Sequence, residues 1–573
     1  MQTEDDRLAV VLCWHMHQPE YRDTATGHYA LPWTLLHATK DYVDMAAHLE
    51  AEPGARAVVN FSPVLLEQIA DCTTRLGAYL AGDTAPLPDP LLAALAGELP
   101  ASAEARRVLI AQCLRANTSR VIARFPAWER RCELVRRIGT EHADLDFLSD
   151  AFVRDLACWY LIGWIGETVR RTDTRVQHLQ EHADGFDAED RQAMLRIVHG
   201  LLAGLLPRYR ALADADRIEL AMSPWGHPIL PLLQDPHAGL EAQPQGLRQS
   251  LDHYPDGDGR ARWHLRRGRE VFRQCFGREP AGCWPSEGAI STRTLRLLGE
   301  EGFAWCASGE GVLRNSVRLG GMDASDAGIE ACMHRVYRLH DTAVNVFFRD
   351  DGLSDLIGFR YADWHADDAV ANLLHHMDNI AAACPDRRNC AISVILDGEN
   401  AWEYYPENAF HFLGALYRGL AHHPRLVPET FSGFLARRSP EARVLPTVVA
   451  GSWVYGTLST WVGSADKNRG WERLVEAKQA FDRAVAGGRL TGDALAAAER
   501  QLAVCEGSDW FWWFGDENPA ASVSDFDRLF RHHLATLWRL CGEAPPANLA
   551  EPLSAGRGDP ARGGVMRPGS EHP

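Results

Sequence analysis

Seven short apolar runs, separated by long stretches with helical spacing, constrain the fold of this chain more than any other feature. The runs are apolar on both faces, which is typical of parallel strands buried between helices. The long stretches between them suit βα crossover connections. The pattern predicts an α/β barrel, complete or distorted. The expected strands cover residues 8–13, 57–61, 218–222, 281–284, 303–307, 343–348 and 391–396.

The pattern also divides the chain into parts. Residues 1–420 are expected to form the barrel, with a helical insertion at about 69–216 that is either scaffold or a contact for substrate. Residues 421–545 begin with an aromatic, glycine-rich segment and continue as a mainly helical region. Residues 546–573 are rich in proline and glycine, a composition that predicts disorder.

Composition excludes several classes of function. The 573 residues include 77 acidic and 59 basic ones, a net charge of −18. A protein this acidic is repelled by the phosphates of nucleic acids and anionic membranes, and it suits a neutral ligand such as a sugar polymer. We find neither a secretory signal nor an apolar stretch long enough for a membrane span. The 13 cysteines show no CxxC pair and indicate reduced thiols, which favours a cytoplasmic location.

Residues that can do chemistry follow nearly every expected strand. In α/β barrels the active site lies at the carboxyl ends of the strands, so these residues are expected to meet there. They are His15 and His17 after the first strand, Trp225 and His227 after the third, Glu287 after the fourth, Arg349 and Asp350 after the sixth, and Asp397 after the seventh.

Glu287 and Asp397 form a candidate pair of catalytic carboxylates. Enzymes that cleave glycosidic bonds usually place two carboxyl groups on either side of the bond, one with a raised pKa. Glu287 lies in GCWPSEGAIS, and Asp397 ends the apolar run in AISVILDGENAWEYYP, beside Glu399 and Glu403. A single acid at a strand end is more often a cap or an ion-pair partner. Two of them in aromatic, glycine-bearing loops favour catalysis.

The segment CWHMHQPEY places His15 and His17 two residues apart on an extension of the first strand, so that both point to one side. The pair alone is compatible with three roles. The two histidines can donate hydrogen bonds to sugar hydroxyls, they can bind a metal ion, or one of them can be a core histidine.

The chain contains 18 tryptophans, a high number. Flat aromatic faces stack on sugar rings, and those beside glycine in SPWGHP, GSWVYG and TWVGS are the better candidates. Burial in the core is the alternative for each. The tryptophans expected to contact substrate are Trp225, Trp284, Trp402, Trp453, Trp461 and Trp510.

Together these segments resemble glycoside hydrolase family 57 over residues 8–540. The motifs that carry the resemblance appear in the family's order along the chain. They are His17-Gln18-Pro19, Gly226-His227-Pro228-Ile229-Leu230-Pro231, Trp284-Pro285-Ser286-Glu287, Asp397-Gly398-Glu399-Asn400 and the aromatic region SWVYGTLSTWVG.

This resemblance implies a distorted (β/α)7 barrel, followed by a helical region that completes the substrate groove. It implies a retaining mechanism with Glu287 as nucleophile and Asp397 as general acid/base, and no metal or organic cofactor. The implied substrate is an α-glucan or maltooligosaccharide, cleaved at α-1,4 bonds and in some relatives also at α-1,6 bonds. The motifs look most like the α-amylase/amylopullulanase branch. His15, His17, His227 and Arg349 are then contacts to the central sugar, and Asp350 orients Arg349 or contacts the ligand itself.

Three alternatives remain open from the sequence. A 4-α-glucanotransferase or branching enzyme uses the same covalent intermediate and passes the sugar to another hydroxyl instead of water. A metal-dependent deacetylase or mannosidase would be built around the His15–His17 pair. A non-catalytic glycan-binding protein would bind starch without turning it over.

Overall fold

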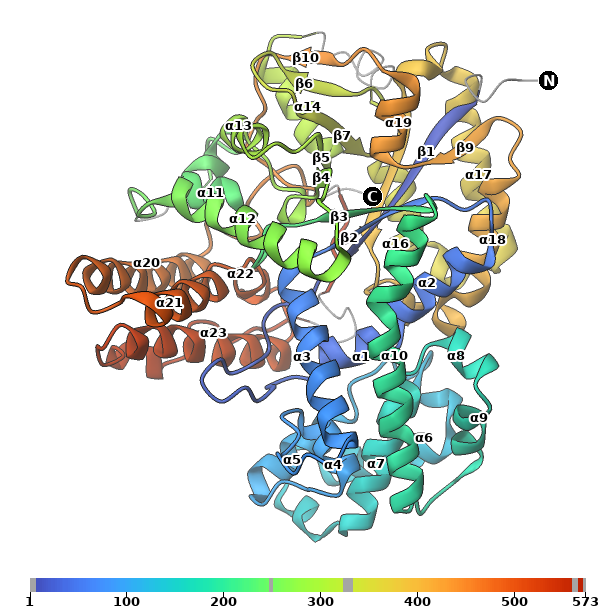
Figure 1. Ribbon diagram of the computed structural model, residues 1–573, viewed down its shortest axis with the longest axis vertical. Coiled ribbons are helices and arrows are strands. Elements are labelled where there is room, and N and C mark those ends of the chain that lie inside the picture. The colour runs from blue at the N-terminus through green and yellow to red at the C-terminus, as the bar shows by residue number, and fades with distance from the viewer. Residues whose placement is uncertain (1–6, 247–250, 323–332, 559–564, 570–573) are drawn as a thin grey trace.

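The computed structural model describes residues 7–246, 251–322, 333–558 and 565–569. Within this part of the chain, one ten-stranded sheet forms the centre of the molecule, and helices surround it (Figure 1). The strands are β1 (Leu8–Met16), β2 (Ala57–Phe61), β3 (Ile218–Met222), β4 (Gly282–Cys283), β5 (Trp305–Gly309), β6 (Tyr337–Leu339), β7 (Asn345–Arg349), β8 (Ala391–Asp397), β9 (Leu426–Glu429) and β10 (Arg443–Leu445).

The strand order is β10-β6-β7-β5-β4-β3-β2-β1-β8, and β9 pairs with the first half of β1. The seven strands from β7 to β8 along this path are parallel. The path closes on itself, because the backbone N–H of Asp350, just after β7, donates to the carbonyl oxygen of Ser393 in β8 at 2.8 Å. The sheet is therefore a distorted (β/α)7 barrel, as the sequence predicts.

All seven predicted strands are present, and β2 and β3 have the predicted bounds. β1 extends to Met16, so His15 lies within the strand, whereas β4 has only two residues. The sequence analysis missed β6, β9 and β10. These strands have three or four residues and carry polar side chains, so they lack the apolar run on which the predictions were based.

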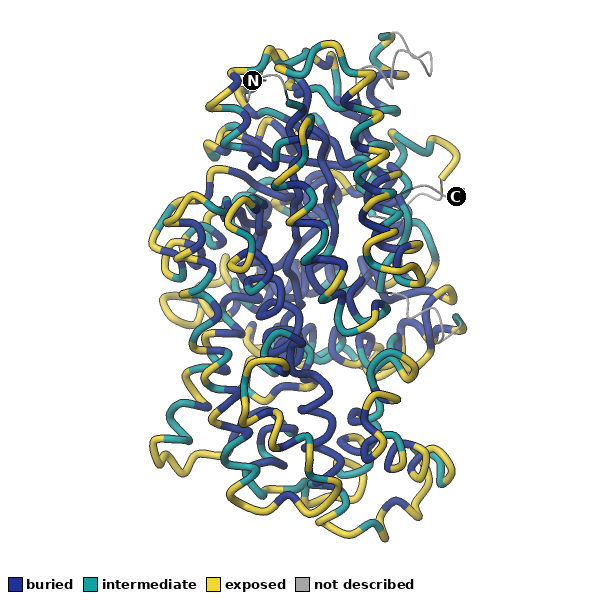
Figure 2. Tube along the Cα trace, turned by 90° about the vertical axis from the view of Figure 1, so that its right-hand side faces the viewer, coloured by how far each residue is buried: buried dark blue, intermediate teal, exposed yellow. Residues whose placement is uncertain are grey.

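The two faces of β1 separate the core into two layers. Alternate residues Ala9, Val11 and Cys13 belong to a small cluster inside the barrel, whereas Leu8, Val10, Leu12 and Trp14 pack outward against the helices. Both layers are fully buried, and Figure 2 shows this buried centre surrounded by more exposed helices. Because side chains alternate along a strand, His15 continues the inward-facing row.

Three groups of helices surround the sheet. Around the barrel lie α1 (Trp33–Thr39), α2 (Asp41–Ala51), α11 (Leu230–Gln234), α12 (Gly257–Phe276), α13 (Thr292–Glu300), α14 (Glu310–Leu319), α16 (Asp351–Phe359), α17 (Ala366–Ala383), α18 (Phe410–Ala421) and α19 (Phe431–Arg438). The insertion between β2 and β3 is helical, as expected, with α3 (Pro63–Leu80), α4 (Pro90–Ala96), α5 (Ala103–Gln112), α6 (Pro126–Ile138), α7 (Asp150–Gly163), α8 (Glu167–Thr172), α9 (Thr174–Glu181) and α10 (Ala188–Asp214). Figure 1 shows it below the sheet, with α20 (Ala465–Ala486), α21 (Gly492–Cys505), α22 (Asp509–Trp513) and α23 (Ala520–Leu540) to one side. No helix in the described ranges is long and apolar enough to span a membrane.

The predicted disorder from residue 546 onward does not fit the parts of that region that the structure describes. Leu553 and Ser554 are buried, and the backbone N–H of Leu553 donates to Asp527 of α23 at 2.7 Å. A composition rich in proline and glycine disfavours helices and strands. It does not prevent an extended segment from docking on a surface that other elements have already formed, and such docking has no periodic signal in sequence.

Candidate active site

Glu287 lies in a strained turn directly after β4. The short helix η5 (Ser286–Gly288) contains it, and its φ is 58°, in the left-handed region. Such a backbone costs about 1–3 kcal/mol in a non-glycine residue and is concentrated at functional sites. Two hydrogen bonds from Trp453 stabilise this turn. The backbone N–H of Trp453 donates to the carbonyl oxygen of Glu287 at 3.0 Å, and its indole N–H donates to Oε2 at 2.9 Å.

Asp397 is the last residue of β8 and lies opposite His15 in the ladder with β1. The N–H of Gly398 donates to the carbonyl oxygen of His15 at 2.7 Å. A Cβ at position 398 would lie 2.6 Å from Sδ of Met16, so glycine is what permits this close approach. The side-chain amide of Asn400 donates to Oδ2 of Asp397 at 2.9 Å and fixes the orientation of the carboxyl group.

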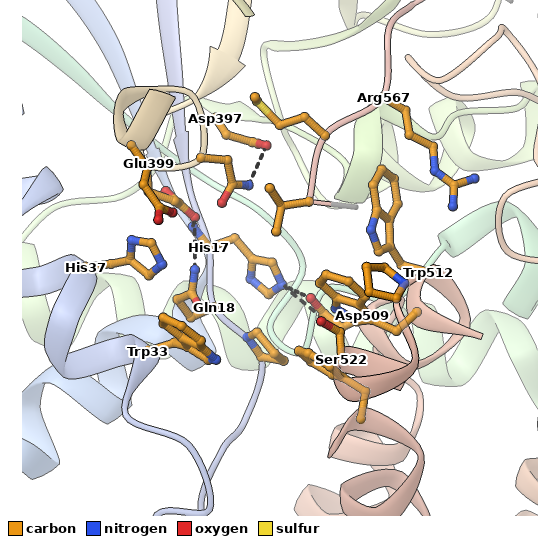
Figure 3. A pocket seen from close by; sticks show the side chains of 18 of the residues that line it. His17, Gln18, Trp33, His37, Asp397, Glu399, Asp509, Trp512, Ser522 and Arg567 are labelled. Atoms are coloured by element: carbon orange, nitrogen blue, oxygen red, sulfur yellow. Dashed lines mark hydrogen bonds and ion pairs between the residues drawn. The ribbon is translucent and has the colours of Figure 1, made fainter. Parts of the chain in front are cut away.

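Both carboxyl groups line one cavity of about 1090 Å³, at the upper end of the volumes typical of ligand sites. Two strand ends that are 110 residues apart in sequence thus deliver acids to the same space. Figure 3 shows Asp397 above the cavity, with the N-terminal motif on one side and the C-terminal helices on the other. The wall also includes His15, His17, Gln18, Trp33, His37, Asn117, Arg349, Glu399, Trp453, Asp509, Trp512 and Arg567.

Burial raises the pKa of both acids. It raises the pKa of Glu287 to about 8, and the negative charge of Asp397 adds to the increase, whereas the Trp453 hydrogen bond opposes it. It raises the pKa of Asp397 to about 6, against the hydrogen bond from Asn400 and the charges of His17 and Arg349. At neutral pH the pair therefore holds one proton between two carboxyl groups. One protonated and one ionised carboxyl is the state that general-acid chemistry with a carboxylate nucleophile requires.

His15 and His227 are buried and neutral. Burial, supported by the charge of His17, lowers the pKa of His15 to about 3, and burial lowers that of His227 well below its usual range. Their Nε2 atoms lie 3.1 Å apart, so one of them carries the proton. Nδ1 of His15 donates to Oδ1 of Asn60 at 2.6 Å, which leaves its Nε2 to accept from His227. Nδ1 of His227 then accepts from the Ser508 hydroxyl at 2.9 Å.

His17 continues the inward-facing row of β1 and stacks on His227, with ring centroids 3.7 Å apart. Its Nε2 donates to the carboxylate of Asp509 at 3.0 Å, and its Nδ1 lies 2.7 Å from the Ser62 hydroxyl. The histidine pair predicted from sequence therefore points to one side, as expected. Asp509 comes from α22, so this contact joins the first strand to the C-terminal helices.

His17, His227 and Asp509 also have the composition of a metal site. Their ligand atoms all lie within 4.8 Å of one another, and two imidazoles with a carboxylate suit a transition metal such as zinc. In this structure the same nitrogens have hydrogen-bond partners within the protein. Binding an ion would require these hydrogen bonds to break.

Arg349 lies in the cavity wall, whereas Asp350 does not. Arg349 lines the cavity and is fixed by Asp351 at 2.6 Å, Asp355 at 2.7 Å and the carbonyl oxygen of Ile395 at 2.8 Å. Asp350 is absent from the cavity wall. Its side chain accepts from the N–H of Leu353 as the N-cap of α16, and its other oxygen pairs with His334 at 2.9 Å. A cap at a helix start satisfies the backbone, which is the ordinary role of Asp there.

Of the six tryptophans expected to contact substrate, Trp453 alone is in the wall of this cavity. The other five are at most 1% exposed and belong to the interior. Their indole N–H groups or rings pack within the protein; that of Trp402, for example, donates to the carbonyl oxygen of Gly398, and that of Trp510 to Val504. Of the three tryptophans singled out for a neighbouring glycine, Trp453 lines the cavity and Trp225 and Trp461 are buried. The five buried residues are Trp225, Trp284, Trp402, Trp461 and Trp510.

The sequence analysis missed several residues of the wall. Trp33 and His37 come from α1, Asn117 comes from the helical insertion, and Asp509 and Trp512 come from α22. The insertion therefore contributes to the cavity as well as to the scaffold. A signal was available for Asp509, which is an acid within the aromatic run SDWFWW. Trp512 lies in the same run, whereas Trp33, His37 and Asn117 carry no local signal, because only tertiary packing brings them to the strand ends.

Comparison with known proteins gives a family and a fold. The model of glycosyl hydrolase family 57 matches residues 11–445, which include both acids. No curated protein sequence matches the chain.

Three solved structures are similar along most of the chain. A GH57-type branching enzyme from Pyrococcus horikoshii has a TM-score of 0.56 and 15% identity, covering 93% of this chain and 89% of that one. The α-amylase AmyC from Thermotoga maritima has a TM-score of 0.55 and 12% identity, covering 93% of both chains. A 4-α-glucanotransferase from Thermococcus litoralis has a TM-score of 0.51 and 12% identity, covering 93% of this chain and 60% of that one. Identities this low show a shared fold only.

Proposed function

The chain belongs to glycosyl hydrolase family 57, and from this premise we propose that it is a retaining enzyme acting on α-glucans. Glu287 is the nucleophile and Asp397 the general acid/base. One observation carries the proposal: two partly buried acids from separate strand ends line one cavity, and their raised pKa values leave one proton between them at neutral pH.

The proposed role of Asp397 as general acid requires this proton to lie on Asp397 when the substrate is bound. In the ligand-free site Glu287 has the higher pKa and so holds the proton most of the time. A bound glucan shifts this balance. The glycosidic oxygen accepts a hydrogen bond only from a protonated Asp397, and positive charge that develops at the anomeric carbon favours an ionised Glu287. The proton of the interacting pair therefore moves to the residue that uses it.

The reaction then proceeds in two steps. Asp397 donates its proton to the glycosidic oxygen while Glu287 attacks the anomeric carbon, so that the leaving chain departs as an alcohol and a glycosyl-enzyme forms. Asp397, now ionised, removes a proton from the acceptor hydroxyl, which attacks the same carbon and releases Glu287 as a carboxylate. His15 and His17 on β1, with Arg349 on β7, lie in the same wall and are the expected contacts to the central sugar. His227 is fully buried. Its hydrogen bond to His15 and its stacking on His17 hold these two rings in position.

We propose hydrolysis of α-1,4 bonds as the principal activity, in line with the resemblance of the motifs to the α-amylase/amylopullulanase branch. Transfer to a sugar hydroxyl is the second candidate, because the similar structures include a branching enzyme and a 4-α-glucanotransferase. Their TM-scores differ too little from that of the amylase to favour either reaction. The two reactions differ only in the acceptor of the second step.

Incubation with a single maltooligosaccharide distinguishes these reactions. Hydrolysis raises the concentration of reducing ends, whereas transfer redistributes chain lengths at a constant number of reducing ends. In hydrolysis the new reducing end released from the glycosyl-enzyme is the α-anomer, which proton NMR detects before mutarotation, and in transfer the new glycosidic bond is α. A β-anomer would contradict the retaining mechanism. Loss of activity with a chelator and recovery with zinc would favour a metal enzyme built on His17, His227 and Asp509 instead.

The expected location is the cytoplasm. All cysteines in the described ranges are free thiols, and most of them are buried. Free thiols without disulfides suit a reducing compartment.

A further inference from the structure

Residues 565–569 contribute to the wall of the cavity that holds the two carboxyl groups. We call them the 565–569 segment. Val565, Met566 and Arg567 are part of the cavity wall together with Glu287 and Asp397. They are separated from the catalytic motifs by more than 160 residues of sequence, and no helix or strand contains them. The protein thus places a piece of its own extended backbone where a linear substrate is expected to bind.

Gly569 anchors this segment beside Arg349. Its N–H donates to Oδ2 of Asp355 at 2.9 Å, and its carbonyl oxygen accepts from the N–H of Tyr455 at 3.0 Å. A Cβ at position 569 would lie 2.5 Å from Cγ of Asp351 and 2.8 Å from Nη1 of Arg349. Because Arg349 and its acidic partners are fixed by buried hydrogen bonds, only glycine lets the backbone come this close.

Arg567 fixes the segment beside Trp512. Its guanidinium lies over the ring of Trp512, 4.9 Å from the centroid, and 3.6 Å from a carboxylate oxygen of Glu517. Figure 3 shows the Arg567 side chain beside Trp512, across the cavity from Trp33 and His37. An aromatic face is a natural platform for a sugar ring. Here a protein cation covers the face of Trp512 instead.

Val565 and Met566, which precede Arg567, pack against the core. Apolar side chains offer a sugar no hydrogen-bond partners, so this stretch is poorly suited to hold a glucose unit. The half of the cavity that contains Trp33, His37 and Asn117 is lined by other segments. The 565–569 segment therefore narrows the cavity beside Trp512 and Arg349.

We propose that the 565–569 segment sets the chain-length specificity of the enzyme by occupying the Trp512 side of the substrate cleft. Short maltooligosaccharides bind in the remaining space while the segment stays docked. A long glucan that runs through the cleft has to displace the segment and then stacks on Trp512. This inference rests on the proposed function, since it assumes that the cleft binds α-glucans.

The test compares two substrates in two forms of the protein. The full chain and a variant without residues 559–573 are assayed with maltotetraose and with a long linear α-1,4-glucan. We expect the deletion to raise kcat/KM for the long glucan about tenfold, because a docked segment reduces the fraction of molecules competent to bind it. The value for maltotetraose should change less than about twofold, because that substrate does not compete with the segment.

Two full-length variants repeat the test without a deletion. Gly569→Val clashes with Asp351 and Arg349, and Arg567→Ala removes the contact with Trp512 and Glu517. Both should shift the preference toward the long glucan, with maltotetraose as the internal control for any disturbance of Arg349. Arg528→Ala on α23 removes an arginine that is 62% exposed and outside the cavity wall, so its substrate preference should equal that of the parent protein.

A binding measurement separates displacement from catalysis. In the Glu287→Gln variant, the long glucan should increase amide hydrogen exchange at residues 565–569, and maltotetraose should leave it unchanged. An unchanged ratio of the two substrates in the deletion and in both point variants would overturn the inference while the proposed function stands. So would a loss of activity on the long glucan. Inactivity of the full chain and of the deletion on both substrates would remove the proposed function, and this inference with it.

Discussion

The two walls of the active-site cavity are built in different ways. Glu287, Asp397, His15 and Arg349 come from the ends of barrel strands, where backbone ladders and hydrogen bonds fix each side chain. The opposite wall comes from α22, the start of α23 and the 565–569 segment, which are attached through side chains and single backbone contacts. Under the proposed function the strand wall carries the chemistry, and we expect the opposite wall to control which substrates reach it.

The largest test of this comparison replaces the two acids of the strand wall. Glu287→Gln and Asp397→Asn should each reduce kcat by about four orders of magnitude or more, because each removes a group that acts only in the transition state. The rate of maltooligosaccharide turnover measures the effect, and circular dichroism checks the fold. Normal turnover in either variant would contradict the proposed roles.

Asp89→Asn is the matched control. Asp89 is also a buried Asp whose pKa burial raises to about 6, but it lies in the helical insertion as the N-cap of α4. Asn is an equally good cap, so this variant should keep both its stability and its activity. The same chemical change is then silent in one place and inactivating in the other.

The same contrast explains what the sequence was able to predict. Strands buried on both faces leave apolar runs, and parallel strands bring their carboxyl ends together, so Glu287, Asp397, His17 and Arg349 were expected to share one site. The structure places all four in one cavity. No residue pattern records that Trp512 and Arg567 lie across from them, because that proximity depends on how α22 and α23 dock.

The tryptophans show a second limit of the sequence. Residue type states that a tryptophan is able to stack on a sugar, but only packing decides whether its face is accessible. Trp225 and Trp510 are buried, whereas Trp33, which sequence analysis passed over, lines the cavity. Large aromatic side chains contribute most to core stability, so burial is the common outcome for them.

A second, smaller effect tests the side-chain hydrogen bond between the loop that carries Trp453 and the strand turn. Trp453→Phe removes the indole N–H that donates to Glu287 at 2.9 Å and keeps most of the aromatic ring. We expect kcat to fall about ten- to a hundredfold, in the lower range for loss of one aligned donor to a catalytic group. Steady-state kinetics with a maltooligosaccharide measures the change.

Trp128→Phe provides the comparison for that variant. Trp128 is fully buried and donates its indole N–H to the carbonyl oxygen of Cys113 at 3.2 Å, within the helical insertion. Its loss should lower stability slightly and leave kcat within about twofold of the parent value. Equal losses of activity in the two variants would show that the Trp453 effect is a general consequence of removing a buried hydrogen bond.

The smallest expected effect is the pH dependence of kcat/KM. This value should fall by about tenfold per pH unit below the lower pKa of the pair and above the higher one. The pKa values of about 6 for Asp397 and about 8 for Glu287 belong to an interacting pair, so they bound the range in which the pair holds one proton. Below the lower value both carboxyls are protonated and the nucleophile is lost. Above the higher value both are ionised and the general acid is lost. A plot of kcat/KM against pH should therefore be bell-shaped.

The Trp453→Phe variant determines which limb belongs to Glu287. The indole hydrogen bond stabilises the ionised form of Glu287 and lowers its pKa, so removing it should move the basic limb of the profile to higher pH. The acidic limb should move much less, because Asn400 and the neighbouring charges of His17 and Arg349 still act on Asp397. A shift of the acidic limb alone would assign the higher pKa to Asp397 in the free enzyme. The strand wall would then hold the shared proton on the general acid before any substrate enters.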